Sequence, residues 1–164
     1  MIILRKGKEE DIESIQQLAY RTWPEAYGDI LSAEQIDYML QKMYNKGELL
    51  SQLEQGYIFL IAEEDNIDLG FASYSVFDSA NQVYKLHKLY VLPQTHGKGV
   101  GKLLINEVVN LVKRVGGKSL KLNVNRDNKA IEFYKKAGFT VKETVDLDIG
   151  NGFVMEDYVM QLSL

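Results

Sequence analysis

An apolar strand leads into a glycine-rich turn in the stretch LHKLYVLPQTHGKGVG, residues Leu86–Gly101. The turn opens directly onto an amphipathic helix that the apolar periodicity predicts over Val100–Val115. Gly97, Gly99 and Gly101 remove side chains from the turn, so backbone N–H groups can approach an anion closely. The first turn of the helix adds unsatisfied N–H groups and the positive end of its dipole. The sequence therefore predicts a phosphate-binding turn.

The spacing of this turn separates three phosphate-binding motifs. A P-loop needs a hydroxyl residue after its Gly-Lys pair, whereas Gly101-Lys102 is followed by Leu103. The dinucleotide fingerprint needs G-x-G-x-x-G, whereas the chain has G-x-G-x-G. The stretch Gln94–Gly99 instead resembles the acetyl-CoA motif [QR]-x-x-G-x-[GA] of the Gcn5-related N-acetyltransferases, in which the turn binds the pyrophosphate of coenzyme A.

The motif can be aligned in two frames. Gln94–Gly99 fits the expression directly, but alignment on the helix makes Gly99-Val100-Gly101 the family's G-x-G. We prefer the second frame, which puts His96 where Gln or Arg is expected. The resemblance then implies that acetyl-CoA is held by the turn residues His96, Gly97, Lys98, Gly99, Val100, Gly101 and Lys102.

A second motif follows at a consistent distance. After a predicted strand over Ser119–Val124, the segment Asn128–Phe139 (NKAIEFYKKAGF) is similar to the N-x-x-A-x-x-F-Y-x-x-x-G-F signature of the same family. The resemblance implies that Tyr134 protonates the departing CoA thiolate. It also implies that Tyr134 contacts the cofactor near its sulfur and that Asn128 and Lys136 contact the CoA arm or its phosphates. For each of the three an ordinary packing, helix-capping or solvated role is the alternative.

The composition agrees with one domain over residues 1–164. A net charge of −4 without any basic block argues against a nucleic-acid partner. The absence of cysteine excludes a thiol nucleophile, and two separated histidines make a metal site unexpected. No apolar run is long enough to cross a membrane, and the first residues, MIILRKGKEED, lack the apolar core of a signal peptide. We therefore expect a cytoplasmic protein without a membrane partner.

The predicted elements form a mixed α/β (α+β) fold. Apolar alternation predicts strands, and helical periodicity predicts helices between them. The expected strands are Ile2–Arg5, Tyr57–Glu63, Leu69–Phe77, Gln82–Val91, Ser119–Val124, Phe139–Leu147 and Phe153–Leu162. The expected helices are one from Glu9, Ala33–Met43, Glu48–Gln55, the helix at Val100 and Lys129–Ala137. The resemblance implies the order β-α-α-β-β-β-α-β-α-β-β. It also implies a mostly antiparallel sheet of about seven strands, with a V-shaped splay between the fourth and fifth. In that splay, backbone groups of Leu89, Tyr90 and Val91 would pair with pantetheine and polarise the thioester.

The general base is not defined by the resemblance. Some members of the family use a Glu early in the fourth strand, where this chain has Lys85 nearby. His87 shares that strand face by period two, and its ordinary pKa near 6.5 suits proton relay. Further candidates on strands that could line the site are Glu63, Glu156 and Tyr158.

The acceptor is expected to contact Trp23–Met43. Trp23, Tyr27 and Tyr38 offer aromatic faces. Negative charge comes from Glu25, Asp29, Glu34 and Asp37, and the combination favours a cationic amine. The chain also loosely resembles bacterial polyamine-type (spermine/spermidine) acetyltransferases here and near its end, at Gly152–Tyr158. These observations favour direct acetyl transfer from acetyl-CoA to a primary amine of a small molecule, polyamine-like or amino-acid-like, or of a peptide.

Two other functions remain open from the sequence. A catalytically silent acyl-CoA sensor would keep the glycine turn and use bound CoA to set conformation or assembly. A nucleotide-binding protein would prefer ATP or NAD to CoA. The strand edge of the C-terminal hairpin allows a homodimer.

Overall fold

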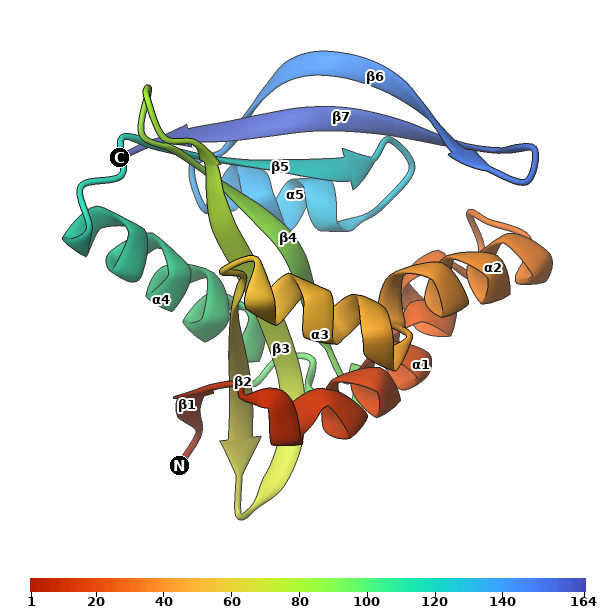
Figure 1. Cartoon of the computed structure of the whole chain (residues 1–164), viewed down its shortest axis with the longest axis horizontal. Helices are drawn as coiled ribbons and strands as arrows, with labels where there is room; N and C mark the ends of the chain where they lie inside the picture. The colour runs from red at the N-terminus through yellow and green to blue at the C-terminus, as the bar shows by residue number, and fades with distance from the viewer.

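Seven strands form one sheet in the order β1-β2-β3-β4-β5-β7-β6 in the computed structural model, which describes residues 1–164 (Figure 1). Every neighbouring pair is antiparallel except β4 and β5. The strands are β1 (Ile3–Lys6), β2 (Ile58–Glu64), β3 (Ile67–Asp78), β4 (Val83–Val91), β5 (Ser119–Asn125), β6 (Thr140–Gly150) and β7 (Phe153–Ser163). The predicted fold class is confirmed, and each expected strand is present with bounds that differ by a few residues.

Three helices precede β2, one more than the element order implied by the resemblance, because the short helix expected over Glu48–Gln55 is a separate element. Side-chain caps separate these helices. Ser32 Oγ accepts from the Gln35 N–H at 3.1 Å, and Asn45 Oδ1 accepts from the Glu48 N–H at 2.8 Å. The helices are α1 (Ile12–Tyr27), α2 (Ala33–Tyr44), α3 (Lys46–Glu54), α4 (Val100–Arg114) and α5 (Ala130–Lys136).

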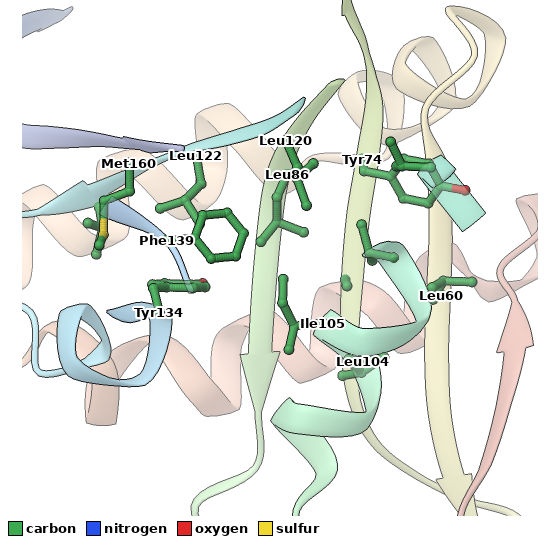
Figure 2. Close-up of a cluster of buried hydrophobic side chains, with 14 of the residues drawn as sticks. Leu60, Tyr74, Leu86, Leu104, Ile105, Leu120, Leu122, Tyr134, Phe139 and Met160 are labelled. Atoms are coloured by element: carbon green, nitrogen blue, oxygen red, sulfur yellow. The ribbon is translucent and has the colours of Figure 1, made fainter. Parts of the chain in front are cut away.

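Two apolar cores cover the two faces of the sheet. Period-two alternation divides β2 between them: Leu60 faces one core, while Phe59 and Ile61 face the other. The first core packs α4 and α5 onto the sheet through residues such as Leu104 and Tyr134 (Figure 2). The second core packs α1, α2 and α3 onto the opposite face.

The parallel pair β4–β5 separates partway along its length. Their register runs only from Val83 opposite Ser119 to Leu86 opposite Leu122, although both strands continue. A register shift against β3 falls at the same point, because Tyr74 pairs with Leu86 and Ser73 with Lys88. A bulge of this kind bends its strand and increases its twist. β4 therefore turns away from β5, and the two strands diverge in Figure 1.

No helix of the protein combines the length and the apolar character that crossing a membrane requires.

Candidate active site

A cleft of about 1070 Å³ opens where β4 and β5 separate. Its walls come from the unpaired ends of both strands, the glycine turn, the beginning of α5 and the end of α1. Leu89, Tyr90 and Val91, which we expected to present their backbone to a bound pantetheine, all line it. The unpaired length of β4 leaves those backbone groups without a partner strand on the β5 side.

The glycine turn sits at one end of the cleft with its backbone exposed. Gly97 (φ +90°) and Gly99 (φ +76°) have left-handed conformations, and a Cβ added at either residue would meet nothing within 4 Å. α4 begins at Val100, and its Leu103 N–H is bonded to the Gly99 carbonyl at 3.0 Å. The N–H groups before Leu103 therefore form the open, positive end of the helix. This geometry suits a pyrophosphate, which the turn would bind through its backbone.

All residues of the turn from His96 to Lys102 line the cleft except Lys98. His96, Val100, Gly101 and Lys102 line the cleft together with the two glycines. Lys98 does not line it, because its Nζ lies 3.7 Å from Glu64 on β2.

The loop between β5 and α5 supplies the opposite wall. Asn128 lines the cleft, but its Oδ1 accepts from the Ala130 N–H at 2.8 Å, which caps the helix. Lys136 is exposed and does not line the cleft, so the contact expected for it gains no support. Lys129 occupies the wall instead. Sequence reasoning missed it because an exposed lysine at a helix start carries no distinctive signal.

Tyr134 of α5 lines the cleft and packs edge-on against Phe133 and Phe139, with ring centroids 5.3 and 5.7 Å away. Figure 2 shows Tyr134 beside Phe139. The side chain of Tyr134 is buried, which raises the pKa of the phenol well above its ordinary value, with a smaller contribution from Tyr27. The phenol therefore keeps its proton at neutral pH, as a proton donor must.

A second, smaller pocket of about 390 Å³ lies between α2, α3, β4 and the β6–β7 hairpin. The hairpin tip is held over α2, because Tyr38 Oη and Lys42 Nζ donate to the Ile149 carbonyl at 2.9 and 2.7 Å. The two pockets share the six residues Tyr27, Leu86, His87, Lys88, Tyr90 and Asn123. They therefore meet at the point where β4 leaves β5.

Aromatic side chains form the wall at this junction. Tyr27 Oη and Tyr90 Oη lie 2.8 Å apart, and the Trp23 ring packs 4.7 Å from the Tyr27 ring. Trp23 is only 1% exposed, so its ring belongs mainly to the core, although it lines the smaller pocket. The acids expected to attract a cation lie elsewhere, since Glu25 and Asp29 line the larger cleft and Glu34 and Asp37 line neither pocket.

His87 lies at the junction but is already engaged. Its Nε2 lies 2.7 Å from Ser75 Oγ, and its ring stacks on Tyr57 at 4.2 Å. Burial, assisted by the charges of Lys88 and Lys85, lowers its pKa to about 3. A base that holds a proton so weakly is poorly matched to an ammonium group. These contacts give His87 a structural role and lend no support to the base function expected for it.

Lys88 is a buried cation that the sequence did not single out. Its Nζ donates to Gln52 Oε1 at 2.8 Å and lies 5.5 to 5.6 Å from the ring centroids of Tyr44, Tyr57 and Phe59. Burial lowers its pKa to about 8, against a smaller opposing effect of Glu48.

The other candidate bases lie away from both pockets. Glu63 is 3.5 Å from Arg5 near the β1 edge of the sheet, and neither Glu156 nor Tyr158 lines a pocket. Asp157, between the latter two, does line the smaller pocket. The sequence does carry a signal for it, because Asp157 is two residues from both Met155 and Val159 and therefore shares their buried face of β7.

The fold agrees with the comparison to known proteins. The sequence model of the Acetyltransferase (GNAT) family matches residues 12–139. A spermidine N(1)-acetyltransferase of Thermoplasma acidophilum is 32% identical over 161 residues, covering 94% of this chain and 96% of that protein. A [ribosomal protein bS18]-alanine N-acetyltransferase of Haemophilus influenzae is 34% identical over 94 residues, covering 57% of this chain and 62% of that protein.

Among solved structures, the PaiA N-acetyltransferase of Thermoplasma acidophilum in complex with coenzyme A superposes with a TM-score of 0.86. It is 28% identical, and the match covers 100% of this chain and 99% of that chain. The chain belongs to the Acetyltransferase (GNAT) family, as its motifs predicted. It is an N-acetyltransferase that uses acetyl-CoA.

Proposed function

We propose that the protein transfers an acetyl group directly from acetyl-CoA to a primary amine of a small molecule. The observation that carries this proposal is the junction of two pockets at the divergence of β4 and β5. The cleft of about 1070 Å³ has room for an extended cofactor and carries the anion-binding turn at one end. The pocket of about 390 Å³ is of a size suited to a small acceptor. Two reactants bound in this way would meet at the residues that the two pockets share.

Each wall of the cleft has a role in this reaction. The turn would hold the pyrophosphate through the backbone N–H groups of Gly97 and of Gly99 to Lys102, because those of His96 and Lys98 donate to the carbonyls of Pro93 and Thr95. The backbone of Leu89–Val91 would pair with pantetheine, and one N–H would stabilise the oxyanion that forms on the thioester carbonyl. Tyr134 would donate its proton to the departing sulfur. With no cysteine in the chain, a thiol-bound acetyl intermediate is excluded, which favours direct transfer.

For the acceptor, we propose spermidine as the first candidate. Support comes from the relative that is named for spermidine and that aligns along nearly the whole chain. The aromatic wall at the junction also suits an alkylammonium group. The smaller pocket carries charges of both signs, with Glu48 and Asp157 beside Lys42, Lys85 and Lys88. An amino acid and a peptide that begins with alanine are therefore the right comparison substrates.

The test is an acceptor screen with acetyl-CoA. CoA release can be followed with a thiol reagent, because the protein has no cysteine to react, and the product is identified by mass. We expect acetylated spermidine, formed faster than acetylated amino acid or peptide. Acetyl-CoA binding without any acetylated amine would contradict the proposed transfer and favour the acyl-CoA sensor. Faster acetylation of the peptide would replace spermidine as the acceptor while keeping the reaction.

A further inference from the structure

Asp157 is a buried carboxylate with an unused oxygen. It lies on β7, is 5% exposed and lines the smaller pocket. Its Oδ1 is buried and has no hydrogen-bond partner. Carboxylate oxygens held away from water are almost always paired, because an unpaired buried charge is costly. A partner for Oδ1 is therefore expected to come from the pocket itself.

The neighbours of Asp157 do not supply this partner. Asn123 on β5 lies near enough to the carboxylate to lower its pKa, yet Oδ1 has no hydrogen-bond partner. Arg126 is engaged by Asp146 and by the Val145 carbonyl, and no cation lies within ion-pair distance of Asp157. The titratable groups that act on Asp157 from the surrounding elements are Tyr27 of α1, Lys85 of β4 and Arg126 after β5. The pocket also contains Lys42, Glu48, His87 and Lys88.

Asp157 is also in the right place for the reaction. Its neighbour Asn123 is one of the residues shared by the two pockets, and Asp157 itself lines the smaller one, so the carboxylate lies beside the junction on the acceptor side. Burial raises its pKa above the ordinary value for an aspartate, with opposing effects of Asn123, Lys85 and Arg126. A carboxylate with a raised pKa is a better proton acceptor at neutral pH.

We propose that Asp157 binds the ammonium group of the acceptor through Oδ1 and removes the proton that must leave before attack. This assignment rests on the proposed acetyl transfer and adds to it the base that the sequence did not define. Asp157 takes one proton from the ammonium nitrogen, whose lone pair then forms the C–N bond to the acetyl carbon. The C–S bond breaks as the sulfur receives the proton of Tyr134. The second proton of the attacking nitrogen returns to Tyr134 through water, and Asp157 releases its proton to solvent.

The experiment compares Asp157→Asn with Glu156→Gln in the full chain. The Asn variant keeps the shape of the side chain and removes its basicity. Glu156 is the adjacent carboxylate, exposed on the other face of β7 and outside both pockets, so it is the matched control. We expect kcat/KM for spermidine to fall by about 100-fold or more at pH 7 in Asp157→Asn. Glu156→Gln is expected to match the wild type, and both variants should show the wild-type melting shift with acetyl-CoA.

The pH profile separates a base from a structural residue. Near pH 10, close to the ordinary pKa of an alkylamine, a far larger fraction of the amine is deprotonated in solution than at pH 7, so the defect of Asp157→Asn should shrink there. A defect of the same size at every pH, or no defect at all, would overturn the assignment.

Calorimetric titration of spermidine into the CoA-bound proteins provides a readout that does not depend on turnover. Binding by the wild type and Glu156→Gln but not by Asp157→Asn supports the assignment, even if the wild type proves inactive and the proposed transfer fails. Equal binding by all three proteins, or no binding by the wild type, overturns the assignment.

Discussion

At the scale of single residues, Tyr134 presents the sharpest prediction about the chemistry. Its phenol is buried in the cleft with a pKa raised by desolvation, and it has no role in the glycine turn. Tyr134→Phe removes only the hydroxyl and keeps the ring contacts with Phe133 and Phe139. We expect kcat to fall by about 100-fold or more, because the thiolate then leaves without its acid. The affinity for acetyl-CoA, measured by calorimetry, should stay nearly unchanged; an unaltered kcat at neutral and alkaline pH would remove Tyr134 from the mechanism.

Site residues that belong to a sequence motif could be predicted from the sequence. Site residues whose position depends on contacts between distant elements could not. The glycines of the turn follow from the sequence pattern and Tyr134 from the family resemblance, and the structure brings them into one cleft. Lys88 reads as an ordinary charged residue, because only the tertiary fold buries it, and the single signal for Asp157 is its two-residue spacing from the apolar Met155 and Val159. His87 was proposed as a base from its position on the strand face. Its stacking on Tyr57 and its bond to Ser75 involve residues distant in the sequence, so they could not be predicted from the strand pattern.

At the scale of elements, the turn before α4 needs glycine for two reasons, a left-handed backbone conformation and the proposed binding of acetyl-CoA. Gly99 has φ +76°, and Gly152 in the β6–β7 turn has φ +79°; a Cβ would meet nothing within 4 Å at either site. Alanine should therefore cost a similar amount of stability at both positions, about 1 kcal/mol. Only Gly99 lines the cleft.

We expect Gly99→Ala to weaken acetyl-CoA binding by about 10-fold or more, since its Cβ projects where the backbone must approach an anion. Gly152→Ala should bind acetyl-CoA like the wild type at matched stability. Urea unfolding gives the stability change, and calorimetry gives the affinity. Equal affinities in the two variants would mean that the turn does not bind the cofactor.

Element boundaries and connections were predictable where apolar periodicity and caps agree. The strands β2 to β4 and the closing hairpin follow from alternation and from turn residues. The divergence of β4 from β5 did not follow from any local pattern, and it entered only through the resemblance. Its physical cause is the bulge at His87, where β4 has one residue more than β3 between paired positions.

At the scale of the whole molecule, the buried charge of Lys88 lowers the free energy of unfolding. Lys88 lies at the junction of the two pockets, beside the second core. Burial lowers the pKa of Lys88 to about 8 from an ordinary value of 10.5. The folded state therefore releases this proton at lower pH than the unfolded state. Between about pH 8 and pH 10.5 the unfolded chain binds more protons, so this residue makes the free energy of unfolding rise with pH. At pH 7 both states are protonated, and the full penalty of the buried charge opposes folding.

Lys88→Met should consequently stabilise the protein at pH 7, by about 1–3 kcal/mol after allowance for the lost bond to Gln52. The advantage should diminish toward pH 10, where the wild-type amine is neutral in the folded state. Lys142→Met on the exposed face of β6 is the control and should change stability little at either pH. Urea unfolding at the two pH values measures all three proteins. A destabilised Lys88→Met would mean that the bond to Gln52 and the three aromatic rings outweigh desolvation, so that the buried lysine strengthens the junction that it lines.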